Sequence, residues 1–105
     1  MSTPVTDPLE FLRRQFIARC RTELDQLRAL AADDPEFGRI AHRLAGSAAS
    51  FGFPQVSEAA AVVDDRIRHG PDPAPDEIQA LIESLEKAIA GETQTERDQG
   101  LRPGA

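Results

Sequence analysis

Residues 34–54, DPEFGRIAHRLAGSAASFGFP, contain the start signal, the apolar face and the end signal of one helix. Asp34 is a common N-cap residue, and Pro35 suits the first helical turn because its φ is already helical and its missing NH has no partner there. Apolar side chains then recur at helical spacing, at Phe37, Ile40, Leu44, Ala48 and Phe51. The pattern predicts an amphipathic helix that ends near Phe51, before the flexible Gly52.

A second helix start signal of the same kind lies near the beginning of the sequence. Asp7 can cap a helix, Pro8 suits the first helical position, and Glu10 completes a capping-box spacing. The apolar positions from there on share one stripe at about 100° per residue, and they are Leu9, Leu12, Phe16, Cys20, Leu24 and Leu27. We predict a long amphipathic helix from Asp7 to about Ala31.

Two more helices are predicted after Gly52. Pro54 opens the first of them, which ends near residues 68–70 and has apolar positions at Val56, Ala59, Ala60, Val63 and Ile67. The proline-containing loop GPDPAPDE, residues 70–77, precedes the last helix. That helix is predicted to end at Gly91, and its apolar positions are Ile78, Leu81, Ile82, Leu85 and Ile89.

Four amphipathic helices with short connections bury their stripes most simply as an antiparallel up-and-down bundle. No segment has the alternating pattern of a strand. We therefore predict an all-α, single-domain four-helix bundle over residues 7–91, preceded by an N-terminal arm at residues 1–6. Residues 92–105 are polar and lack periodicity, and they are predicted to form a disordered C-terminal tail.

Composition narrows the classes of partner. The chain has 18 acidic and 12 basic side chains and a formal charge of −6, and no basic stripe is present, which argues against nucleic acid. Cys20 is the only cysteine, so an intramolecular disulfide is impossible. The sequence lacks a secretory signal pattern and a membrane-spanning stretch. We expect a cytoplasmic protein with no nucleic-acid or membrane partner.

His42 lies opposite the apolar stripe of its helix, so its imidazole is expected to face outward. Four of the positions that neighbour it on the helix hold small residues, Gly38, Ala45, Gly46 and Ala49. A glycine inside a helix costs about 1 kcal/mol relative to alanine, so helix stability does not explain Gly46. A helix face without long side chains leaves room for another surface to approach. We expect these four residues to form a docking face around His42.

A histidine in this setting has two chemical roles open to it, because a neutral ring nitrogen can bind a metal or attack phosphorus. A metal site lacks ligands, since His69 is the only other histidine and no acidic cluster at ligand spacing accompanies His42. A hydrolytic triad lacks a serine or an acid at helical spacing. A lone nucleophilic imidazole remains, and the alternative is an exposed histidine without a chemical role.

The other polar residues of the third helix are predicted to be structural. His69 precedes Gly70 and suits a helix C-terminus, where it favours the dipole. Asp64, Asp65 and Arg66 are predicted to lie on a solvated face.

Residues 41–65, AHRLAGSAASFGFPQVSEAAAVVDD, resemble the signature of histidine-containing phosphotransfer (HPt) domains. That signature runs roughly H-x-L-K-G-S, followed one helical turn later by a glycine. The matching positions are His42, Leu44, Gly46, Ser47 and Gly52. Because the order of helices is also similar, the resemblance extends over about residues 7–90.

The resemblance implies a phosphoryl carrier without kinase activity of its own. In such domains the histidine takes a phosphoryl group from a receiver-domain aspartate and passes it to the aspartate of another receiver, so His42 is the implied phosphoacceptor. The implied partners are response-regulator receivers and a hybrid histidine kinase of a bacterial-type phosphorelay. The receiver is expected to supply Mg²⁺, and this chain is expected to be a monomer that holds no cofactor or metal.

One position departs from the family pattern. Ala45 stands where the family usually has a lysine, whose ammonium can lie near the phosphoryl oxygens. Arg39 and Arg43 are the candidates to replace that cation. Because of this substitution, an adaptor of the same fold that binds receiver or kinase domains without phosphorylation is the first alternative. A structural bundle with an accidental match is the second.

Overall fold

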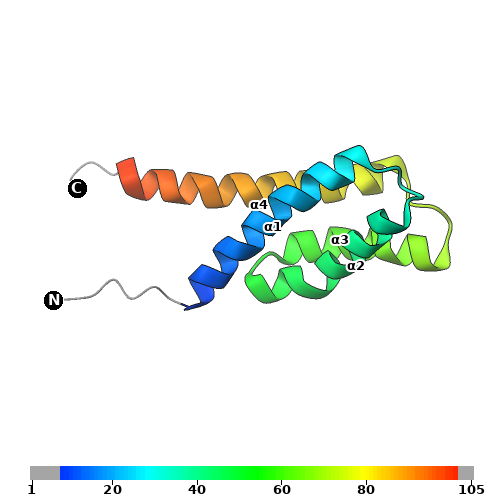
Figure 1. The fold of residues 1–105 in the computed structure, drawn as a ribbon, viewed down its shortest axis with the longest axis horizontal. Coiled ribbons are helices and arrows are strands. Elements are labelled where there is room, and N and C mark those ends of the chain that lie inside the picture. Colours follow the sequence, from blue (N-terminus) through cyan, green and yellow to red (C-terminus); the bar gives the residue numbers. More distant parts are fainter. Residues whose placement is uncertain (1–7, 102–105) are drawn as a thin grey trace.

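The computed structural model describes residues 8–101, and their backbone forms helices and no strand. The helices are α1 (Pro8–Ala29), α2 (Pro35–Ser47), the short 3-10 helix η1 (Ala48–Phe51), α3 (Pro54–His69) and α4 (Pro75–Leu101). Figure 1 shows that successive α-helices run in alternating directions, with the α1–α2 and α3–α4 connections at one end of the bundle. The predicted all-α four-helix bundle is therefore confirmed.

The core is mainly aliphatic, with Phe16 and Phe37 as its buried aromatic residues, and it draws on all four α-helices. Phe37, Ile40 and Leu44 of α2 are at most 1 % exposed, as their stripe predicts. Cys20 of α1 is also fully buried, and burial, with the nearby Glu23 carboxylate, raises the pKa of its thiol to about 12. A thiol with such a pKa is almost entirely protonated near neutral pH, so Cys20 acts as a core side chain.

The first turns of α1 are less buried than the sequence predicts. Leu9 and Leu12 were expected in the apolar stripe, but they are 49 % and 45 % exposed. Figure 1 shows the reason, because α1 crosses α4 at an angle and its N-terminal turns lie apart from α4. The stripe is buried only from Phe16 onward, where that ring stacks on Phe51 with centroids 4.8 Å apart.

The helix starts and turns follow the local signals closely. The Asp34 side chain caps α2 by accepting a hydrogen bond from the NH of Glu36 at 2.8 Å, with Pro35 in the first turn. Gly52 ends η1 with a φ of 92°, a left-handed conformation that glycine adopts without steric cost. Both features were predicted, whereas the Asp7 cap and the arm at residues 1–6 lie outside the described residues.

Helix ends differ in three places. The helix that was predicted to reach Phe51 tightens into η1 after Ser47, and α1 ends at Ala29 rather than Ala31. The predicted end of the last helix at Gly91 is wrong, because α4 continues to Leu101. One glycine costs a helix only about 1 kcal/mol, and residues 92–101 contain no proline to stop it. The rest of the expected tail, residues 102–105, lies outside the described residues.

The start of α4 is tied to α3 by an ion pair. Both carboxylate oxygens of Glu77 accept hydrogen bonds from the Arg66 guanidinium at 3.0–3.2 Å, and Oε1 also accepts one from the NH of Ala74 at 2.9 Å. These hydrogen bonds lower the pKa of the Glu77 carboxyl, and those from the Arg66 side chain have the largest effect. Arg66 therefore belongs to the bundle scaffold and not to a purely solvated face.

Glu77→Gln is expected to lower the midpoint of thermal unfolding at pH 7 by a few degrees. Because the pKa of Glu77 is lower in the folded chain, its charged form stabilises the fold above the unfolded pKa, and this contribution disappears as the pH falls through the folded value. The gap between wild type and variant should thus narrow on acidification below pH ~4.5. Glu83→Gln, on the same helix, is the control; an equal gap at all pH values would contradict the prediction.

Candidate functional site

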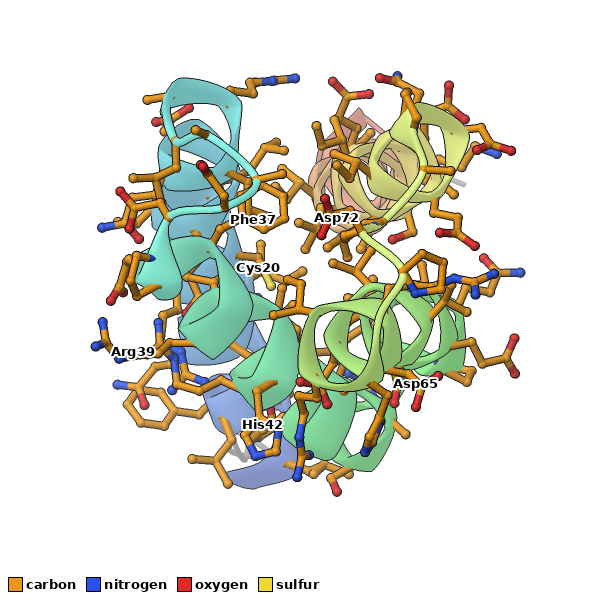
Figure 2. All side chains as sticks on the ribbon, turned by 90° about the vertical axis from the view of Figure 1, so that its right-hand side faces the viewer. Cys20, Phe37, Arg39, His42, Asp65 and Asp72 are labelled. Atoms are coloured by element: carbon orange, nitrogen blue, oxygen red, sulfur yellow. The ribbon has the colours of Figure 1, made fainter. Side chains whose placement is uncertain are left out.

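His42 projects from the outer face of α2, and 63 % of its side chain is exposed. Its Nδ1 lies 3.2 Å from Oδ2 of Asp64 on α3, although the two residues are 22 positions apart in the chain. The Asp64 side chain is only 14 % exposed. In Figure 2 the imidazole points away from the bundle, at the side where α2 and α3 meet. The α2–α3 packing thus places a largely buried carboxylate beside an exposed imidazole.

This contact determines which ring nitrogen can react. An ionised carboxylate only accepts hydrogen bonds, so Nδ1 must carry the proton in the contact with Asp64. In the neutral ring the lone pair then resides on Nε2, the nitrogen that has no partner among the described side chains. His42 therefore presents the lone pair of Nε2 outward, and Asp64 lies where a carboxylate can stabilise positive charge on the ring.

Asp64 also binds a cation that the sequence did not single out. Arg68, one turn later on α3, places Nη1 3.6 Å from the same Oδ2 atom that His42 contacts. The prediction that Asp64 lies on a solvated face is wrong. A signal was available in the sequence, because Asp64 is only 40–60° around its helix from the apolar positions Ala60 and Ile67, at about 100° per residue.

The two arginines proposed from the sequence both have carboxylate partners. Nη1 of Arg39 lies 2.8 Å from Oε1 of Glu36 in an exposed pair on α2. Nη2 of Arg43 lies 3.1 Å from Oε2 of Glu23, a buried side chain of α1 whose Oε1 has no partner among the described residues. Arg43 is thus directed toward α1, and both candidate cations are paired with carboxylates of the same chain. In each pair the guanidinium keeps N–H donors beyond the nitrogen that contacts the carboxylate.

A family model for the Hpt domain matches residues 12–91 of the chain. The chain belongs to the Hpt domain family. Members of this family serve histidine phosphotransfer in phosphorelays. No curated protein and no solved structure matched the chain. The family assignment therefore agrees with the exposed, oriented imidazole.

The four small residues around His42 divide into two pairs in this Hpt domain. Gly46 and Ala49 are exposed, and an added Cβ at Gly46 would meet no atom within 4 Å. Gly38 and Ala45 are half-buried at the α2–α3 contact. A Cβ at Gly38 would lie 3.3 Å from Cγ2 of Ile67, so this glycine permits close helix packing. Docking by a partner remains the prediction for all four residues, and the open surface lies at Gly46 and Ala49.

Gly46 offers a direct test of the open surface. Gly46→Ala is expected to raise the free energy of unfolding by up to about 1 kcal/mol, because a methyl group fits and alanine favours the helix. Gly46→Lys should also fold, but should slow phosphoryl transfer at least about tenfold by obstructing the partner. Urea unfolding and initial labelling rates measure the two effects. Gly91→Lys, at another helical glycine with open space, is the control, and equal rates for both lysine variants would contradict the prediction.

The rest of the Hpt domain offers no competing site among the described residues. No group of three or more His, Cys, Asp and Glu side chains in the described part of the chain could hold a metal ion. No helix in that part is long and apolar enough to cross a membrane. His69 is exposed near the end of α3, with Nδ1 3.0 Å from Oδ1 of Asp65, one turn earlier on that helix. His42 differs from His69 in having its carboxylate supplied by another helix.

Proposed function

We propose that this Hpt domain carries a phosphoryl group on Nε2 of His42 between receiver domains of a cytoplasmic, bacterial-type phosphorelay. The observation that supports the proposal most strongly is the Nδ1 contact with Asp64, because it leaves the nucleophilic lone pair on the exposed nitrogen. The domain acts as a monomer and has no kinase activity of its own. A hybrid histidine kinase is the expected source of the first receiver.

The proposed transfer step is a displacement at phosphorus. Nε2 attacks the phosphorus of a receiver aspartyl phosphate, the P–N bond forms as the P–O bond breaks, and the electron pair stays on the receiver carboxylate. The ring then carries a positive charge, which Asp64 stabilises through the proton on Nδ1. The receiver supplies the Mg²⁺ that neutralises the phosphoryl oxygens. The return step, to a second receiver, is the same displacement in reverse.

The cation beside the phosphoryl group is proposed to be an arginine in place of the family's usual lysine. Arg39 and Arg43 flank His42 on α2, and Arg68 reaches it from α3. Arg68 is best placed for two reasons. Its closest carboxylate contact, 3.6 Å to Asp64, is longer than those of the other two arginines, and it involves the same Asp64 oxygen that His42 contacts. A bound phosphoryl group would offer this guanidinium several charged acceptors.

The proposal is tested by incubating the purified domain with a panel of receivers that carry labelled aspartyl phosphate. We expect the label to move to the domain and to be stable in alkali and labile in acid, as phosphohistidine is. Receivers shown to be competent with another Hpt domain are the positive control. If competent receivers bind the domain without labelling it, the adaptor function replaces the carrier function, and the absence of both binding and label would contradict both.

A further inference from the structure

A groove leads from His42 along the α2–α3 boundary to the end of the bundle that holds the interhelical loops. It consists of a cavity of about 490 Å³ beside His42 and a cavity of about 660 Å³ at the loops. The two share Pro35, Gly38 and Ile67 in their walls, so they adjoin each other, and together they make up the groove. Ile67 is 37 % exposed and gives the groove an apolar floor where the missing side chain of Gly38 leaves room.

The two ends of this groove differ in whether their charged side chains form ion pairs. Near His42, the guanidinium groups of Arg39, Arg43 and Arg68 all lie within 4 Å of carboxylates of the domain. At the loop end, the groove is lined by the exposed Asp33 and Asp72, and no described side chain forms an ion pair with either. Figure 2 shows Asp72 at this end of the bundle, in the connection between α3 and α4. The uncompensated charge of the groove is therefore negative and lies away from His42.

A receiver interface of standard size that is centred on His42 also covers this acidic end. Asp34 precedes His42 by eight residues, which is about 12 Å along α2 at 1.5 Å per residue. A standard protein interface buries about 800 Å² per partner, which corresponds to a disc of about 16 Å radius. An interface centred on His42 thus extends past the start of α2. Carboxylates that a partner covers without pairing are costly, so the surface opposite them has to carry cations.

We propose that the cognate receiver places an apolar side chain over Ile67 and a lysine or arginine beside Asp33 and Asp72, and that this carboxylate pair selects among receivers. The inference rests on the proposed function, because it takes a receiver as the occupant of the groove. Receivers with an acidic or neutral surface at that place are disfavoured by repulsion or by unpaired carboxylates. Phosphoryl chemistry at His42 and partner choice at the loop end are then separate properties of one surface.

The test measures the affinity of each receiver in the panel for wild type and for Asp33→Asn/Asp72→Asn. The receiver that labels His42 is expected to bind the variant about tenfold more weakly at low ionic strength, and less so at high salt. Asp25→Asn/Glu83→Gln makes the same change of net charge on exposed residues outside the groove, and should alter affinity less than about twofold. Equal effects of the two double variants, or none, would overturn the proposal.

A second pair of variants tests the apolar floor. Ile67→Ser is expected to weaken binding of the same receiver several-fold, whereas Val62→Ser, at a 44 % exposed position of α3 that does not line the groove, should not. If label reaches His42 while neither test changes affinity, the inference fails and the proposed function stands. If receivers bind in an Asp33- and Asp72-dependent way without labelling His42, the inference stands and the carrier function fails. Absence of binding by every receiver overturns the inference.

Discussion

His42→Gln is expected to abolish acquisition of label from phosphorylated receivers, to below about one hundredth of the wild-type rate. Glutamine keeps a polar side chain of similar reach but has no basic nitrogen, so no P–N bond can form. The fold should be unaffected, because the imidazole is 63 % exposed and belongs to no core cluster. The measurement is the initial rate of labelling by a receiver that labels the wild type, with circular dichroism as the check on folding.

His69→Gln is the matched control for this experiment. His69 is also exposed, and its Nδ1 also lies near an aspartate, 3.0 Å from Oδ1 of Asp65. If any exposed histidine beside a carboxylate could be phosphorylated, His42→Gln and His69→Gln would each lose part of the label. We expect full labelling of His69→Gln. Residual acid-labile label on His42→Gln that disappears in the double variant would identify His69 as an acceptor and contradict the assignment.

Asp64→Leu is expected to slow transfer about tenfold to hundredfold, by analogy with the range found when a carboxylate that orients a metal-binding histidine is removed. The carboxylate keeps the proton on Nδ1 and opposes the positive charge that develops on the ring during attack. Asp64→Asn retains an acceptor at the same place but not the charge, so its rate should fall between those of wild type and Asp64→Leu. Receiver affinity should change little, because the Asp64 side chain is only 14 % exposed.

A tautomer measurement separates this positioning role from a structural one. Nitrogen NMR of the His42 ring should show the proton on Nδ1 in the wild type and a larger share of the Nε2-protonated form in Asp64→Leu. Asp65→Asn, the adjacent aspartate that contacts His69, is the control and should leave both the His42 tautomer and the transfer rate unchanged. A slowed Asp64→Leu with an unaltered tautomer would mean that the residue acts through the fold instead.

The local sequence was sufficient to predict the four α-helices and the outward position of His42. A cap followed by proline starts α2, glycine stops η1, and periodic apolar residues give each helix its buried face, because all these effects act within a few residues. The end of α4 could not be predicted in this way. The difference in free energy between extending a polar helix and ending it is small, and a single glycine at position 91 did not end α4.

The partners of His42 required the packing of helices against one another. Asp64 reaches the imidazole from 22 residues away, and Glu23 draws Arg43 toward α1 from 20 residues away. Periodicity within a segment specifies which face of a helix is buried, but not how far that helix is rotated or shifted against its neighbour. At Gly38 an added Cβ would lie 3.3 Å from Cγ2 of Ile67, so the missing side chain permits the close approach of α2 and α3. The outward face of His42 could therefore be predicted from one helix. The carboxylate beside it depends on the α2–α3 interface, because side chains at the edge of a stripe become buried or exposed only when two helices meet.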